Sequence, residues 1–180
     1  MNFWHDIKKE RVSPDKFLAV IEIPKASKKK YELDKETGAL ILDRVLHTAT
    51  HYPANYGFLP LTYAEDGDPL DVLVLCSEDL DPLTSVECYP IGAVRMTDAG
   101  EVDDKIIAIP FGDPTYNFYK EVSALPPHIL DELMHFFKVY KQLENSKTTA
   151  DIQTYDVVQA KEIINRSLKA YTQLRKEGKI

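Results

Sequence analysis

Three aspartates stand close together in the stretch Asp66-Gly67-Asp68-Pro69-Leu70-Asp71, immediately before the apolar run at residues 72–75. A short apolar run bounded by turn residues predicts a buried strand, so the carboxylates lie on a tight turn that leads into the core. Gly67 permits backbone conformations closed to other residues, and Pro69 restricts the residue before it. Crowded carboxylates repel one another unless a cation lies among them. Their oxygen atoms suit a hard divalent cation.

A plain acidic turn is the simplest alternative, because Asp-Gly and Asp-Pro pairs are common turn formers. A calcium loop of the EF-hand type does not fit. Its twelfth position would be Ser77 rather than Glu, and no helix pattern flanks the segment.

Other charged residues interrupt segments that are expected to form strands. Glu22 lies within the apolar run Phe17–Ile23, where an unpaired buried charge is costly. Either this strand is at an edge and exposes Glu22 to water, or Glu22 points into a charged site. A second acidic loop is expected at residues 97–105, where Asp98 and Asp103 precede Lys105.

Two acidic clusters, with Lys, Arg and Tyr scattered through the same region, suit phosphoryl chemistry. Carboxylates would hold several Mg²⁺ ions, and the basic and phenolic groups would bind phosphate oxygens. With no His/Cys cluster, Mg²⁺ is favoured and Mn²⁺ is a possible substitute. The sequence contains no Walker-type glycine loop, kinase loop or dinucleotide fingerprint.

The composition argues against several classes of protein. The formal net charge of −7 disfavours a general nucleic-acid or membrane-surface binder, which needs a basic face. The cysteines, Cys76 and Cys88, both lie in strand-like segments and are expected to be buried free thiols. The first residues lack the apolar segment of a signal peptide, and no run is long enough to cross a membrane. We therefore expect a cytoplasmic protein.

The elements that must position these residues change character along the chain. Strands are expected at 17–23, 30–33, 39–46, 72–75, 86–96 and 106–109, with a bend at Pro90–Gly92. Residues 34–38 have the composition of a hairpin turn that closes at Gly38. Residues 52–60 are too irregular for a helix, and 145–155 form a polar connection. Helical spacing follows at 129–140, and again after Asp156, a candidate cap, with Gly178 just beyond the end.

This order, strands first and C-terminal helices after them, indicates an α+β fold, and the short, bent, closely spaced strands favour a small closed β-barrel over an open parallel sheet. We expect one domain over residues 1–180. It comprises an N-terminal arm at 1–16, a mainly β part with the active site at 17–125, and a helical part at 126–180.

The sequence resembles the soluble family I inorganic pyrophosphatases of the prokaryotic type. The stretch Asp66–Asp71 matches that family's signature. The resemblance is collinear from about residue 17 to 145 and includes residues 20–24, 30–32, 43–44, 52–57, 96–98, 103, 105 and 140–141.

The resemblance implies a role for each matching residue in the Mg²⁺-dependent hydrolysis of inorganic pyrophosphate to two phosphates. A metal-activated water would attack in line, with Asp68 as the general base. The remaining residues would serve as metal ligands (Glu22, Asp66, Asp71, Asp98 and Asp103), as substrate ligands (Lys30, Arg44, Tyr56, Lys105, Tyr140 and Lys141) and as supporting members (Glu32 and Tyr52).

The resemblance also implies a five-stranded OB-like barrel with helices packed outside, and a homohexamer. His135 matches a contact position of such hexamers, whereas Val139 stands where a second histidine is often found. The chain departs from the family at residues 146–155, which are polar, and its only tryptophan is Trp4. This departure concerns packing near the C-terminal helix.

Two other functions remain to be weighed against the enzyme. An OB-fold could bind single-stranded nucleic acid through Lys28–Lys30 and the tyrosines, although the net charge and the carboxylates oppose this. The acidic turns could instead form a structural Ca²⁺ site in a protein without activity.

Overall fold

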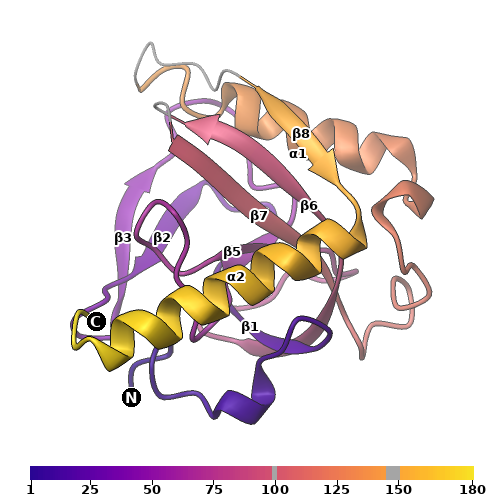
Figure 1. Cartoon of the computed structure of the whole chain (residues 1–180). Coiled ribbons are helices and arrows are strands. Elements are labelled where there is room, and N and C mark those ends of the chain that lie inside the picture. Colours follow the sequence, from indigo (N-terminus) through magenta and orange to yellow (C-terminus); the bar gives the residue numbers. More distant parts are fainter. Residues whose placement is uncertain (99–100, 145–150) are drawn as a thin grey trace.

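The computed structural model describes residues 1–98, 101–144 and 151–180, without the side chains of Asp98 and Glu101 (Figure 1). The strands are β1 (Phe17–Ile23), β2 (Lys29–Leu33), β3 (Leu40–Val45), β4 (Asn55–Phe58), β5 (Asp71–Val74), β6 (Ser85–Asp98), β7 (Glu101–Pro110) and β8 (Ile152–Tyr155). The helices are α1 (Pro127–Val139) and α2 (Val157–Lys176), with 3₁₀ turns at Lys9–Arg11 and Val122–Ala124.

Five of the described strands close into a ring. β1 pairs antiparallel with β4 and with β6, β4 pairs antiparallel with β5, and β6 pairs antiparallel with β7. The remaining neighbours, β5 and β7, run parallel and complete the closure. The α+β class and the small OB-like barrel predicted from the sequence are confirmed.

Every residue of β1 is buried, because both of its edges are paired. The interpretation of this strand as an edge strand that exposes Glu22 to water is therefore wrong. The bend predicted in the long strand β6 is present as a register shift between Pro90 and Gly92.

Two predicted loops are strands in the structure. β7 begins at Glu101, so Asp103 and Lys105 lie on a strand and face one side, whereas Asp104 faces the other. Residues 152–155, predicted as a polar connection, form β8 on the edge of β6. Their polar pattern misled the prediction because this strand is half-exposed: Gln153 and Thr154 face solvent.

The strands β2 and β3 form a separate two-stranded sheet that stands beside the ring (Figure 1). The turn that joins them closes at Gly38, whose φ of 73° is a left-handed conformation that glycine adopts at no steric cost. The predicted hairpin is confirmed. It brings Lys30 and Glu32 to the edge of the ring.

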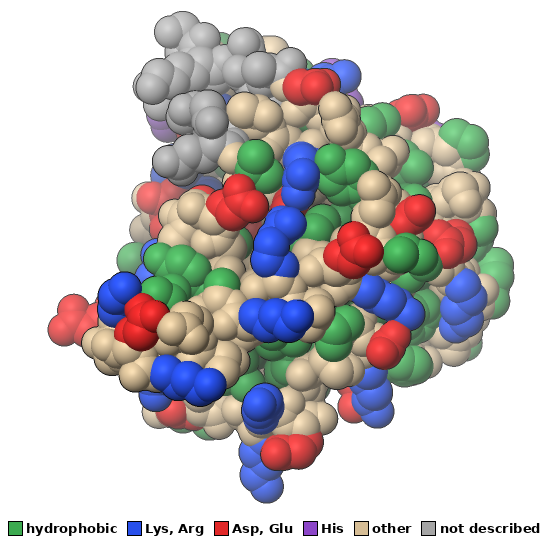
Figure 2. Space-filling model, in the orientation of Figure 1, with side chains coloured by type: hydrophobic (Ala, Val, Ile, Leu, Met, Phe, Trp, Pro, Cys, Tyr) green, Lys and Arg blue, Asp and Glu red, His purple; other side chains and the backbone are tan. Residues whose placement is uncertain are grey.

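The two helices cover different parts of the barrel. α1 buries Leu133, Phe136 and Phe137 against the core that includes Tyr52 and Ile107. α2 lies across the ring, and its exposed side carries a row of Lys and Arg side chains (Figures 1 and 2). A capping box of Asp156 and Gln159 starts α2, as the sequence predicted for Asp156. Among the described residues, no helix is both long and apolar enough to span a membrane.

Candidate active site

Most of the predicted site residues line one cavity of about 300 Å³ between the β2–β3 hairpin, the ring and the end of α1. Its walls are formed by β1, β2, β4, β5, β7, the acidic turn and the segment after α1. The predicted residues in its lining are Glu22, Lys30, Glu32, Tyr56, Asp66, Asp68, Asp71, Asp103, Lys105, Tyr140 and Lys141.

Lys105 lies at the centre of the acidic groups. Its Nζ is 2.6 Å from Oδ2 of Asp71, 2.9 Å from Oδ1 of Asp103 and 2.9 Å from the hydroxyl of Tyr56. The parallel pairing of β5 and β7 sets Asp71 opposite Lys105, which explains their contact. Tyr56 also donates a hydrogen bond to Asp71. One buried ammonium group thus holds two strands and a phenol together.

The pKa values of these groups are shifted by burial and by their mutual charges. Burial raises the pKa of the Asp71 carboxyl above its ordinary value, and the neighbouring Asp103 adds to the shift while Lys105 opposes it. Burial alone would lower the pKa of Lys105, but Asp103 and Asp71 raise it well above its ordinary value. Lys105 therefore stays charged, and the surrounding carboxylates accept further positive charge.

Local hydrogen bonds fix the conformation of the acidic turn. Thr62, fully buried, accepts a hydrogen bond from the Leu70 amide at 2.9 Å, and this bond closes the base of the turn. The Asp66 carboxylate accepts from the Asp68 amide at 3.0 Å, and Gly67 has a φ of 87°. Burial, followed by the charge of Asp103, raises the pKa of Asp66.

Glu22 projects from β1 into the same cavity and is only 8% exposed. Its Oε1 accepts a hydrogen bond from the Leu33 amide at 2.7 Å. Burial raises the pKa of the Glu22 carboxyl to about 8, and the charge of Asp71 contributes in the same direction. The sequence-based alternative, a carboxylate pointed into a charged site, agrees with this position.

On β2, Lys30 contacts Glu32 and lies 3.4 Å from Asp43. Burial lowers the pKa of Lys30, although Asp43 partly offsets the shift. At the end of α1, Tyr140 and Lys141 complete the lining, and the Lys141 ammonium lies 5.4 Å from the Tyr140 ring centroid. Lys30 and Lys141 therefore line the same cavity as the carboxylates, so two different elements supply cations for an anion bound there.

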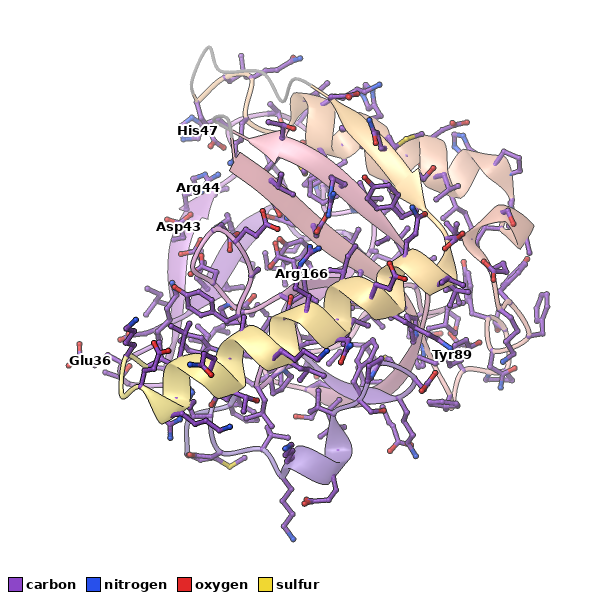
Figure 3. All side chains as sticks on the ribbon, viewed as in Figure 1. Glu36, Asp43, Arg44, His47, Tyr89 and Arg166 are labelled. Atoms are coloured by element: carbon purple, nitrogen blue, oxygen red, sulfur yellow. The ribbon has the colours of Figure 1, made fainter. Side chains whose placement is uncertain are left out.

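Two predicted residues whose side chains the structure describes do not line the cavity. Arg44 contacts Asp43 on β3, its Nε is 2.8 Å from Oε2 of Glu144, and Figure 3 shows Asp43 and Arg44 together at the outer edge of the hairpin. Tyr52 is buried beneath the site, where it packs on Tyr56 and Phe136. The predicted Asp98 carboxylate lies outside the side chains that the structure describes.

One lining residue with a direct contact to a predicted catalytic group was missed. Lys35, from the β2–β3 turn, forms an ion pair with Asp68. No role was predicted for this lysine because it stands in a polar turn, where lysine is usually solvated. The only available signal was the length of the hairpin, which carries its tip over the acidic turn.

The donor set fits a hard divalent cation. Asp71 and Asp103 both contact one positive centre, the Lys105 ammonium, and Asp66 faces the same cavity. All are oxygen donors, which magnesium prefers. Among the described side chains, however, no three acidic, His or Cys residues are close enough to form a complete ligand group. The residues therefore fit the ion in their chemistry and location.

The pKa of Glu22 predicts a pH-dependent stability in metal-free protein. Because its pKa rises from an ordinary 4.5 to about 8, folding takes up a proton between these values, and this group's stabilising contribution is lost as pH rises through that window. Glu22→Gln keeps the acceptor for the Leu33 amide and has no such loss. We expect its Tm, relative to the parent chain, to increase from pH 5 to pH 8 and then level off.

Thermal unfolding of both proteins in chelator across this range would measure the difference, at about 2–4 °C for each kcal/mol. A Tm difference that does not change with pH would contradict the pKa assigned to Glu22.

The whole chain, and not only the cavity, is similar to known proteins. Residues 19–172 match the model of the Pyrophosphatase family, described as inorganic pyrophosphatase. The soluble inorganic pyrophosphatase 2 of Chlamydomonas reinhardtii is 45% identical over 93% of this chain and 87% of that protein. The inorganic pyrophosphatase of Haloferax volcanii is 40% identical over 95% of this chain and 97% of that protein.

Solved structures give the same answer. The inorganic pyrophosphatase of Thermus thermophilus superposes with a TM-score of 0.90 at 35% identity, over 96% of this chain and 99% of that chain. That of Helicobacter pylori superposes with a TM-score of 0.86 at 40% identity, over 93% and 99%. With the acidic turn, the buried lysine and the cations of the cavity lining in place, the chain belongs to the inorganic pyrophosphatase family.

Proposed function

We propose that this chain hydrolyses inorganic pyrophosphate, the activity of its family, with several magnesium ions held by the cavity carboxylates. The observation that carries this proposal is the cavity itself, which Asp66, Asp71 and Asp103 line together with Lys30 and Lys141. A highly charged anion and its counter-cations fit a cavity lined by both acidic and basic side chains.

Asp66, Asp71 and Asp103 would hold magnesium, with Glu22 and Asp98 as further ligands. When bound, magnesium ions neutralise the phosphate oxygens and lower the pKa of water. Asp71 is the central ligand of this set because it already contacts Lys105 and Tyr56.

The substrate would lie in this cavity, among its carboxylates and cations. Lys30, Tyr56 and Lys105 would bind the phosphoryl group under attack, whereas Tyr140 and Lys141, from the same lining, would hold the departing phosphate. Arg44 would join them by turning from Glu144 toward the cavity. These contacts align the bridging P–O bond with the attacking water and stabilise the charge that leaves with the second phosphate.

Asp68 is assigned as the general base. It stands on the acidic turn at the cavity wall, and its carboxylate contacts Lys35 in the substrate-free site. A proton removed from water would pass to Asp68 as the new P–O bond forms and the bridging P–O bond breaks. Tyr52 and Glu32 support this arrangement, the first beneath Tyr56 and the second beside Lys30.

A cytoplasmic location is part of the proposal. Cys76 and Cys88 are both unpaired, which is usual in a reducing compartment.

Phosphate release from pyrophosphate tests the function directly. We expect turnover with Mg²⁺, slower turnover with Mn²⁺, and essentially none with Ca²⁺, which binds the same carboxylates but is larger and acidifies water less. The control is a chelated sample. Equal rates with saturating Ca²⁺ and Mg²⁺ would refute this account of the nucleophile.

Substitutions separate the two acidic roles. Asp71→Asn removes a ligand charge beside Lys105, so both the Mg²⁺ affinity and the rate should fall. Asp68→Asn should leave the Mg²⁺ affinity largely unchanged and lower kcat by about 10²–10⁴-fold, the usual range for a positioned base. A Mg²⁺ titration of the hydrolysis rate across pH measures both effects.

If Asp68→Asn moves the Mg²⁺ midpoint as far as Asp71→Asn does, and kcat recovers at saturating metal, then Asp68 is a metal ligand. The base would then lie elsewhere.

We also propose a hexamer. The apolar face of α1 packs within this chain, so it does not support the assembly. Other apolar groups remain exposed: Phe118 is 64% exposed, and Leu42 on β3 is 53% exposed. Light scattering at micromolar protein should give a mass about six times that of the 20.5 kDa chain. A single species near the mass of one chain would exclude the assembly.

A further inference from the structure

A second cavity lies behind the acidic turn, on the side away from the proposed active site. Its volume is about 300 Å³, and it separates the turn from α2 and from the start of β7. Its lining includes Tyr63, Leu70, Val102 and Ser167. At one side of the cavity, the Tyr63 amide donates a hydrogen bond to the Ser167 carbonyl at 3.0 Å and ties the segment before the turn to α2. Across the rest of the hollow, side chains that do not touch cannot fix the separation of the segments that bear them.

A row of four charged side chains spans this cavity: Arg95, Asp104, Arg166 and Glu65. Asp104, only 8% exposed, receives two hydrogen bonds from Arg95, at 2.7 Å from Nε and 2.8 Å from Nη2. On the other side, Nη2 of Arg166 lies 3.2 Å from Oδ2 of Asp104 and 3.5 Å from Oε1 of Glu65. Figure 3 shows Arg166 rising from α2 toward the strands above it.

The two carboxylates that Arg166 joins are next in sequence to two proposed metal ligands. Glu65 precedes Asp66 on the turn, and Asp104 follows Asp103 on β7. Because neighbouring residues on a strand point to opposite faces, Asp104 faces α2 while Asp103 faces the active-site cavity. A contact made behind the site therefore acts on the spacing of the groups in front of it.

We propose that Arg166 is a positioning residue, which sets the separation of Asp66 and Asp103 by bridging Glu65 and Asp104. The inference rests on the proposed function, since it takes both aspartates as metal ligands. Magnesium demands near-ideal octahedral geometry, so small changes in that separation weaken its binding. Arg166 touches neither the metal ligands nor the cavity that they line.

The bridge is not needed to satisfy a buried charge. Arg95 already neutralises Asp104 with two hydrogen bonds, and it also lies 5.0 Å from the ring centroid of Tyr155. The Arg166 and Glu65 side chains are each more than half-exposed, so their pairing adds little to overall stability. Replacing Arg166 should leave the fold intact.

The sign of the change in Mg²⁺ affinity separates positioning from simple electrostatics. A positive charge near the site repels Mg²⁺, so neutralising it should tighten binding by Coulomb's law. Loss of positioning should weaken binding instead. Lys169, exposed and about one helical turn from Arg166 on α2, provides the matched control, because its neutralisation removes the same charge without breaking the bridge.

The experiment is isothermal titration calorimetry of Mg²⁺ into the full chain without substrate. Arg166→Gln should weaken Mg²⁺ binding by about 10-fold, the lower end of the effect of groups that orient metal ligands. Arg166→Lys, which can still reach both carboxylates, should restore most of the affinity. Lys169→Gln should bind as the parent chain does, or slightly more tightly.

Unchanged or tighter binding by Arg166→Gln would overturn the inference, as would an equal loss in Lys169→Gln. Should Arg166→Gln fail to fold in circular dichroism, Arg166→Met removes the same bridge and the same positive charge while keeping an unbranched stem, and it carries the same expectation. Asp103→Asn distinguishes the two levels of the argument. If it leaves Mg²⁺ affinity unchanged, the proposed ligand set is wrong. If it weakens binding while Arg166→Gln does not, only the positioning role is wrong.

Discussion

Repulsion among the carboxylates of one cavity is the constraint on which the rest of this structure depends. Glu22, Asp66, Asp71 and Asp103 face one cavity, and burial raises the pKa of the first three. The Lys105 ammonium relieves part of this repulsion by contacting Asp71 and Asp103. The parallel pairing of β5 and β7 makes that contact possible. The ring therefore serves the site by bringing a cation and its partners onto neighbouring strands.

One lysine cannot neutralise the whole cluster, and this shortfall favours divalent cations. The same physics explains why basic side chains, Lys30 and Lys141, also line the cavity. An anion that enters the cavity with its own cations loses its shell of water. The fixed charges of the surrounding side chains then take the place of that hydration. The site thus combines a stable core with an excess of negative charge in the cavity. Only bound cations can neutralise that excess.

Local patterns predicted the elements whose chemistry is local. The acidic turn, the hairpin glycine Gly38, the cap Asp156 and the apolar run of β1 each carried a sufficient signal in neighbouring residues. β8 was missed because its hydrogen bonds come from β6, far away in sequence, and its composition is polar.

The residues of the candidate site divide in the same way, into those that a local pattern predicted and those that it did not. The acidic turn indicated a cation site by itself, but the roles of Lys30, Tyr56 and Lys141 came from the family resemblance. No pattern near Lys35 or Arg166 pointed to the site. Their partners, Asp68 for one and Glu65 and Asp104 for the other, lie on other elements. Such contacts exist only after the chain has folded, so spacing along the sequence cannot predict them.

The short strand β8 has a further consequence, for the behaviour of the protein at high concentration. β1 pairs with β6 only at residues 85–88, and β8 pairs with residues 93–96. Without β8, that upper part of β6 would present unpaired backbone groups to any passing strand, a common route to aggregation. The new edge is only four residues long and exposes Gln153 and Thr154. A stretch that is unremarkable in the sequence thus protects the barrel from polymerising through its longest strand.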